Sequence, residues 1–400
     1  MRIENDTKVS MLGGLAGIVC AVSVLSQIPA FVASGVTSII SILAWLVLAF
    51  FSLMANRGKF LLTVQYPLYI VMVLAGFYLV AAIFDNTYLQ SDLPYVIVLS
   101  MFVLVIGNAV GAQSNRSDLN LIFKCYILSS TILAIVVYRD FFAQVTDTSP
   151  IYVYGEKNST AQILITAVIL IMTTQLGTKE KKRKWLYFGC LVILTAVILM
   201  TKSRATIIFF PFLVWLVLTS SSISKKYKRV ILFCILIIVI VLMRNREFRD
   251  SLLNDILFAG RDSSDMNSLS SGRWEEWQSF FTDWGDGWLF GHGRMKRESL
   301  ILTAFLEYGM FFGMLILVLA AYPLYFALRK LPKQHSERTL LVCVAACYLV
   351  NGVFEQLAPF GPGVKCFFLW FLLGILASPS KDAQARKQID TATVVRRYSN

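Results

Sequence analysis

The chain is a succession of long apolar runs separated by short clusters of charged residues. Each run has about 20 residues, the length of helix that crosses a hydrocarbon core of about 30 Å. The pattern predicts spans at 11–32, 35–54, 64–84, 94–112, 119–138, 160–177, 185–201, 205–221, 230–244, 299–328, 340–354 and 362–378. We therefore expect an all-α polytopic membrane bundle of about 12 transmembrane helices, or about 11 if one short span does not cross. The run that begins at residue 299 is long enough to be tilted or broken.

One polar stretch divides these runs and is long enough to form its own small structure. Helices 1–9 are expected in residues 1–244, a large loop in 245–298, helices 10–12 in 299–378, and a basic tail in 379–400. Four aromatic residues of the loop recur at helical spacing, namely Trp274, Trp277, Phe280 and Phe281. With Ser270 or Ser271 as N-cap, they predict an amphipathic helix over 272–284, which either lies on the membrane surface or packs onto the bundle.

Lysine and arginine gather in alternate loops, and short loops rich in these residues are retained in the cytoplasm. The basic clusters lie at residues 2–8, 57–59, 116, 179–184, 225–229, 329–338 and 381–397. Both termini are therefore expected in the cytoplasm, with the large loop on the outer side of the membrane, which is the periplasm if the cell is Gram-negative. No signal-peptide cleavage site follows the first run, so that helix is expected to be retained in the cell inner membrane.

Composition supports a membrane class. The chain is 57% hydrophobic and 15% charged, whereas soluble domains are about 45–50% apolar and about 25% charged. In a membrane protein a net charge of +13 reflects topology and contact with anionic membrane lipids, so we expect no nucleic-acid partner. The seven cysteines lie in apolar runs and form neither a disulfide framework nor a zinc site.

Arg204 is the first candidate for chemistry, because it separates two apolar runs on the side where cations are sparse. Such a cation is either an anchor that snorkels to the interface or a functional group. With Lys202 and Ser203 before it, a guanidinium there suits capture of a phosphate or diphosphate. Arg273, at the start of the loop helix, is either a surface residue or a second anion-binding group assisted by the helix dipole.

Two carboxylates and a histidine follow near the same face. Glu298 and Glu307 lie just before and inside the run at 299–328, where a carboxylate acts as a base or as a capping or pairing partner. His292 lies in a glycine turn, and with His335 as its only companion no histidine pair supports a metal site. No phosphate-binding glycine loop and no acidic pair for a metal-bound nucleotide sugar is present, so we expect no cofactor and a donor that is not a nucleotide.

Four stretches, taken in order, resemble the family of O-antigen ligases and O-antigen or capsule polymerases, which are integral-membrane glycosyltransferases with a GT-C-like fold. They are GEKNSTA at 155–161, TKSRATIIFF at 201–210, SGRWEEW at 271–277, and LFGHG at 289–293 followed by ESLILTAFLEYGMFFG at 298–313. In that family the last stretch usually begins with His-Asn and ends with Gly-x-x-Gly. Here Glu298 and Ser299 take the first two positions, and the final glycines are one residue further apart. The missing histidine favours a polymerase over a ligase, although TKSRAT and the FEQ at 354–356 look like some ligases.

The resemblance implies metal-independent, inverting glycosyl transfer at the outer leaflet, from an undecaprenyl diphosphate-linked glycan to an acceptor sugar. Arg204 and Arg273 would neutralise the diphosphate leaving group, and Glu298, or else His292, would accept the proton of the acceptor hydroxyl. The expected substrate-binding residues are Lys202, Ser203, Asn158, Arg294, Arg297 and Glu307.

Three functions remain open, and the identity of the acceptor distinguishes the first two. A repeat-unit polymerase, which we favour, elongates another lipid-linked repeat and has a chain-length regulator as a further partner, whereas a ligase transfers polymer to lipid A-core. A lipid-linked sugar transporter or flippase, of another class, should show repeat symmetry and polar residues at mid-membrane depth. Neither feature is evident in the sequence.

Overall fold

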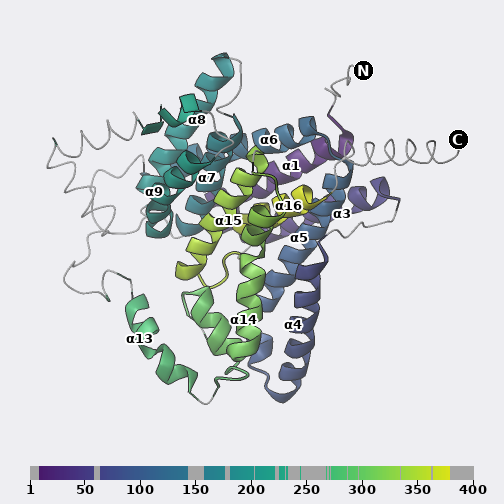
Figure 1. Ribbon diagram of the computed structural model, residues 1–400, viewed down its shortest axis with the longest axis vertical. Helices are drawn as coiled ribbons and strands as arrows, with labels where there is room; N and C mark the ends of the chain where they lie inside the picture. The colour runs from purple at the N-terminus through teal and green to yellow at the C-terminus, as the bar shows by residue number, and fades with distance from the viewer. Residues whose placement is uncertain are drawn as a thin grey trace, which may run out of the picture.

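The computed structural model describes residues 9–57, 64–142, 157–175, 181–201, 203–220, 225–229, 272–285, 287–295, 297–333, 335–361 and 364–378, with a few single residues between 231 and 270. Within these ranges every regular element is a helix, and Figure 1 shows the helices gathered into a bundle with α13 at its edge. The α-helices are α1 (Met11–Leu25), α2 (Pro29–Ala33), α3 (Thr37–Ala55), α4 (Gln65–Phe84), α5 (Leu93–Gln113), α6 (Arg116–Val137), α7 (Lys157–Leu170), α8 (Lys181–Met200), α9 (Arg204–Thr219), α13 (Arg273–Trp284), α14 (Leu300–Arg329), α15 (Ser336–Phe354) and α16 (Val364–Ala377). A 3₁₀ turn, η1 (Tyr88–Gln90), precedes α5, and π turns η2 (Tyr138–Phe142) and η3 (Ile171–Gln175) extend α6 and α7.

The described residues contain 7 helices long and apolar enough to cross a membrane: α3, α4, α5, α6 with part of η2, α8, α14 and α15. Three shorter apolar helices, α1, α9 and α16, accompany them. The chain is therefore a helical membrane protein. Every expected span except 230–244 overlaps one of these helices or α7. Most of 230–244 lies outside the described residues, so the total of about 12 crossings remains a prediction.

Asp118 joins the starts of α1 and α6. Its carboxylate accepts a hydrogen bond from the backbone N–H of Asn115, and the Asn115 side chain accepts one from the backbone N–H of Asp118, each at 2.9 Å. The same carboxylate accepts from the N–H of Ser10 at 2.7 Å and from its hydroxyl at 2.9 Å, and Ser10 in turn caps α1. These bonds satisfy N–H groups that a helix start leaves without partners, which fixes α1 and α6 side by side.

The centre of the bundle is α7. Every residue from 160 to 171 is buried, and the helix contacts α6, α8, α9, α15 and α16. At the periphery, α4 buries only Pro67 and Leu74 and contacts α5, α14 and η1. The side chains of α7 are therefore shielded by protein, whereas α4, which is apolar enough to span a membrane, presents its side chains to the surroundings, which for a membrane protein are lipid.

The expectation that the run after residue 299 is tilted or broken is confirmed. α14 contains Gly309 with φ 70° and ψ −176°, a non-helical conformation between two helical segments. A side chain is strongly disfavoured at this φ, and glycine removes that cost. The break separates a first segment of about two turns from the long remainder of the helix.

The predicted loop helix is present as α13. Its N-cap is Gly272 rather than a serine, although the Ser270 hydroxyl still accepts a hydrogen bond from the N–H of Trp274 at 2.8 Å. Phe280 packs against Leu302 and Leu306 of α14, which favours the packing interpretation for that residue. Phe281, with 77% of its surface exposed, points away from this contact.

Candidate functional site

Three helix ends meet at Asn158, the second residue of α7. Its side-chain amide donates a hydrogen bond to Glu355 Oε1 at 2.6 Å, and its carbonyl oxygen accepts one from the Ser203 hydroxyl at 3.1 Å. Ser203 is the N-cap of α9, and Glu355 is the C-cap of α15. Ser203 also lies 3.2 Å from the hydroxyl of Thr206, one turn into α9. Segments that are far apart in the sequence therefore share one small polar cluster.

Arg273 is held against the same end of α15. Its Nη2 donates to the Phe354 carbonyl at 3.1 Å and lies 2.5 Å from Glu298 Oε2. The arginine side chain is only 18% exposed, whereas that of Glu298 is 57% exposed. The guanidinium is therefore mostly enclosed, while its carboxylate partner reaches into the surroundings and is free to move aside for another anion.

Phe354 and Glu355 are neighbours, so the two groups of contacts form one site. We name Asn158, Ser203, Arg273, Glu298 and Glu355 the arginine site. Arg204 directly follows Ser203, is half-buried and has interactions of its own. A shared arginine clamp formed by Arg204 and Arg273 stays a prediction, and Lys202 lies outside the described residues.

A ladder of polar side chains leads from the arginine site into the bundle between α7 and α15. Its rungs are Asn158 with Glu355, Gln162 with Asn351, and Thr166 with Tyr348. The α7 members recur at every fourth position and therefore share one helix face. In the two inner rungs all four side chains are at most 6% exposed, so they bond to one another instead of to water. The sequence analysis did not identify these interior polar residues.

Glu307 lies in a separate, closed cluster with Ser91, Met295 and Tyr308, which we name the Glu307 cluster. The Ser91 hydroxyl donates to Glu307 Oε2 at 2.6 Å and accepts from the Tyr308 hydroxyl at 2.9 Å. The Met295 N–H donates to the other carboxyl oxygen at 3.1 Å. Glu307 is 1% exposed, and with both oxygens occupied its position favours a structural role over the predicted substrate contact.

Backbone hydrogen bonds join the glycine turn to α14 at the break in this helix. His292 and Gly293 donate their backbone N–H groups to the carbonyls of Leu306 and Glu307, at 2.8 and 3.3 Å, and Met310 donates to Trp288 at 2.8 Å. Gly291, with φ 84°, passes so close to α14 that a Cβ there would collide with the Glu307 carbonyl. The loop thus supplies bonds that the helix loses at Gly309, which is how irregular backbone is accommodated inside a membrane protein.

Near this turn, η1 is tied to the loop by a tyrosine. The Tyr88 hydroxyl donates to the Phe290 carbonyl at 2.9 Å. Burial raises the pKa of the Tyr88 hydroxyl, with a further contribution from the Asp85 carboxylate. The group therefore remains a hydrogen-bond donor at neutral pH, which keeps η1 attached to the turn.

The other residues predicted near this turn, His292, Arg294 and Arg297, differ in exposure and in the groups that they contact. His292 and Arg294 are exposed, and the His292 ring lies against Gly287, where a Cβ would collide with it. Arg297 is paired with Asp283 of α13 at 2.5 Å. No group of three or more histidine, cysteine or acidic residues suited to a metal ion occurs in the part of the chain that the structure describes.

Glu355 is the residue of the arginine site that the sequence analysis did not select. The signal that finds it is the spacing of polar residues in two apolar helices: Asn158, Gln162 and Thr166 in one, Tyr348, Asn351 and Glu355 in the other. No protein-family model matches the chain, and no curated protein matches it either.

Proposed function

We propose that the protein is a membrane glycosyltransferase that uses an undecaprenyl diphosphate-linked glycan at the periplasmic face of the inner membrane. In this proposal the bundle is GT-C-like with about 12 crossings, both termini are cytoplasmic, and the reaction is repeat-unit polymerisation. The ligase reaction, with lipid A-core as acceptor, is the nearest alternative.

The observation that supports the proposal is the convergence of the arginine site. Asn158, Ser203 and Arg273 come from three of the four stretches that resemble the glycosyltransferase family. Asn158 and Arg273 form hydrogen bonds to the end of α15, and Ser203 forms one to Asn158. Glu298, from the fourth stretch, pairs with Arg273. An enclosed guanidinium with an exposed, displaceable carboxylate suits reversible binding of a diphosphate.

In the proposed reaction an acceptor hydroxyl oxygen attacks the anomeric carbon of the donor from the face opposite the diphosphate. The bond from that carbon to the diphosphate oxygen breaks, and the leaving group departs with the electron pair. Arg273 and Arg204 stabilise the charge that develops on the diphosphate. Glu298 accepts the hydroxyl proton, and Glu355 is a second carboxylate at the same end. Because a diphosphate is a good leaving group, orientation of the two substrates supplies much of the rate.

The test is the banding pattern of surface polysaccharide in a strain that lacks the gene, complemented with wild type or with Arg204→Ala, Arg273→Ala, Glu298→Gln or Glu355→Gln. Loss of polymerase activity leaves core capped with one repeat unit and no ladder. Bare core with accumulated lipid-linked polymer instead identifies a ligase. If all four variants restore polymer as wild type does, the catalytic role of the arginine site is wrong.

A transporter of lipid-linked sugar is the second candidate, and one observation favours it. The inner rungs of the polar ladder place Gln162, Thr166, Tyr348 and Asn351 inside the bundle, where a transport pathway needs polar groups. In proteoliposomes with donor confined to one leaflet, a transporter moves the intact donor across the bilayer. A glycosyltransferase instead converts it to longer glycan and free lipid diphosphate.

A further inference from the structure

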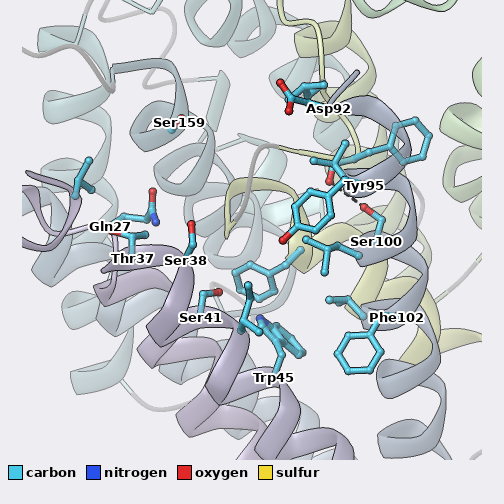
Figure 2. Close-up of a pocket in the computed structure, with 18 of the residues that line it drawn as sticks. Gln27, Thr37, Ser38, Ser41, Trp45, Asp92, Tyr95, Ser100, Phe102 and Ser159 are labelled. Carbon is cyan, nitrogen blue, oxygen red and sulfur yellow. Dashed lines mark hydrogen bonds between the residues drawn. The ribbon is translucent and has the colours of Figure 1, made fainter. Parts of the chain in front are cut away.

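A cavity of about 520 Å³ opens beside the arginine site, between α3, α5 and the turn that follows α15. Figure 2 shows Gln27, Ser38 and Ser41 along one wall and Asp92 and Tyr95 on the other. Ser159, the residue after Asn158, also lines it. Its volume lies within the range of about 300–1,000 Å³ that is typical of small-molecule sites.

The lining changes from polar to apolar along α3. Thr37 and Ser38, in the first turn of the helix, are followed by Ser41 and then by Trp45. Trp45 forms the floor and packs against Phe367 of α16 with ring centroids 5.0 Å apart. α3 is one of the helices long and apolar enough to span a membrane. Trp45 lies in the middle of this helix, so the floor of the cavity is at hydrocarbon depth, and the rim is near the first turn of α3. An amphiphile has this same order of polar and apolar parts.

Several polar groups in the cavity have no hydrogen-bond partner among the residues that the structure describes. The side chains of Gln27, Ser38 and Ser159 make no hydrogen bond in the described part of the chain, and neither does the Ser41 hydroxyl. Ser41 is only 8% exposed. The Ser41 hydroxyl still faces the cavity, so a ligand with hydroxyl or ether oxygens can form a hydrogen bond with it.

The cavity differs from the arginine site in the charge of the residues that line it. Among the described residues that line it there is no lysine or arginine, and Asp92 is its one carboxylate. A phosphate brought here would lose water and meet a like charge without gaining a cation. A neutral head with many hydroxyl groups finds hydrogen-bond partners at the rim, and aromatic faces such as that of Tyr95 suit the apolar face of a sugar ring.

We propose that this cavity binds a neutral glycolipid, with its sugar head among the hydroxyl and amide groups of the rim and one hydrocarbon chain over Trp45. The proposal rests on the cavity alone and holds for a transferase or a transporter. It differs from the diphosphate proposed at the arginine site in charge and in the residues that would contact it.

The probe is an alkyl maltoside brominated in mid-chain, titrated into nanodiscs that contain the full-length protein and no other brominated lipid. Bromine quenches tryptophan fluorescence on contact, so the difference between wild type and Trp45→Phe isolates the signal of Trp45. We expect this signal to be quenched saturably. An alkyl phosphate with the same brominated chain should need about tenfold more probe, since a phosphate finds no cation in the cavity.

Three variants sharpen the test. Ser41→Phe fills the cavity and should abolish the saturable quenching, whereas the matched control Leu43→Phe, on the exposed face of α3, should retain it. Asp92→Lys, at the exposed rim, should shift the preference toward the alkyl phosphate even if Ser41→Phe fails to fold. Equal quenching by both probes, or saturable quenching that survives in Ser41→Phe, means that Trp45 reports bulk lipid and overturns the proposal.

Discussion

Two glutamates near one end of the bundle have opposite surroundings. Glu307 is 1% exposed, and donors from Ser91 and Met295 occupy both of its carboxyl oxygens. Glu355 lies just beyond α15, is half-buried, receives a hydrogen bond from Asn158 and has a further interaction. A polar group enclosed on all sides holds elements together, whereas a half-buried one still has surface that a ligand can reach.

The structure points to a different glutamate from the one that the sequence analysis selected. Glu307 was expected to bind substrate, because it lies at the lip of a membrane helix. The structure encloses Glu307 among hydrogen-bond partners and leaves Glu355, which was not selected, half-buried at the arginine site. Burial and hydrogen-bond partners, rather than position along a helix, are the basis on which we propose a structural role for Glu307 and a functional one for Glu355.

The largest effect is expected from Glu307→Ala, which should destabilise the fold. It leaves the Ser91 hydroxyl and the Met295 N–H without an acceptor, at about 1–3 kcal/mol for each unpaired group, and it opens a void. The midpoint of thermal unfolding in detergent measures the loss. Glu307→Gln, which retains one acceptor oxygen and the volume, should lose much less. If neither variant lowers the unfolding midpoint, Glu307 is not a structural partner and the comparison fails.

Arg273→Ala should have the next largest effect, on rate rather than stability. Removing one group that stabilises charge in a transition state costs about 10²–10³-fold in kcat. Turnover of a lipid-linked repeat in proteoliposomes measures this loss, with thermal unfolding as the parallel readout. Arg139→Ala is the matched control, because Arg139 also pairs with a carboxylate, Asp140 at 2.8 Å, but is 74% exposed. A similar loss in both variants would point to a general effect of surface charge.

The positions of the helices were predictable because the length of each apolar run can be read directly from the sequence. The starts of α5 and α14 and the end of α15 lie at or next to the expected boundaries. Hydropathy predicts a span at 160–177 and another at 64–84 but does not show that protein encloses the first and that the second lies at the periphery, since lipid and protein interior both select apolar residues. The pairing of Asn158 with Glu355 depends on which two helices meet, and no local pattern specifies that.

Asn351→Leu tests whether the polar ladder belongs to the fold or to the function. It removes the second rung and leaves Gln162 without its partner, and hydrogen bonds between membrane helices contribute about 0.6 kcal/mol on average. We therefore expect a small fall in the unfolding midpoint and unchanged turnover. The paired replacement of Gln162 and Asn351 by leucine should restore stability. If the single variant abolishes turnover in a well-folded protein, the ladder takes part in function and the transporter reading gains support.

A loss of turnover far smaller than that of Arg273→Ala is expected from Arg297→Ala, although Arg297 lies close to the arginine site in sequence and was predicted to bind substrate. Its guanidinium is paired with Asp283 at 2.5 Å, and both side chains are about a quarter exposed, at 22% and 26%. Ion pairs that solvent reaches contribute about 0–1 kcal/mol, so turnover should fall by less than about fivefold. If Arg297 serves only to fix α13 to the start of α14, Asp283→Ala should lower turnover by the same amount, and the double variant should be no worse than either single variant. A loss of turnover in Arg297→Ala alone that approaches the loss in Arg273→Ala would instead extend the arginine site to Arg297. Such a loss, absent from Asp283→Ala, would mean that Arg297 contacts the substrate as well as Asp283.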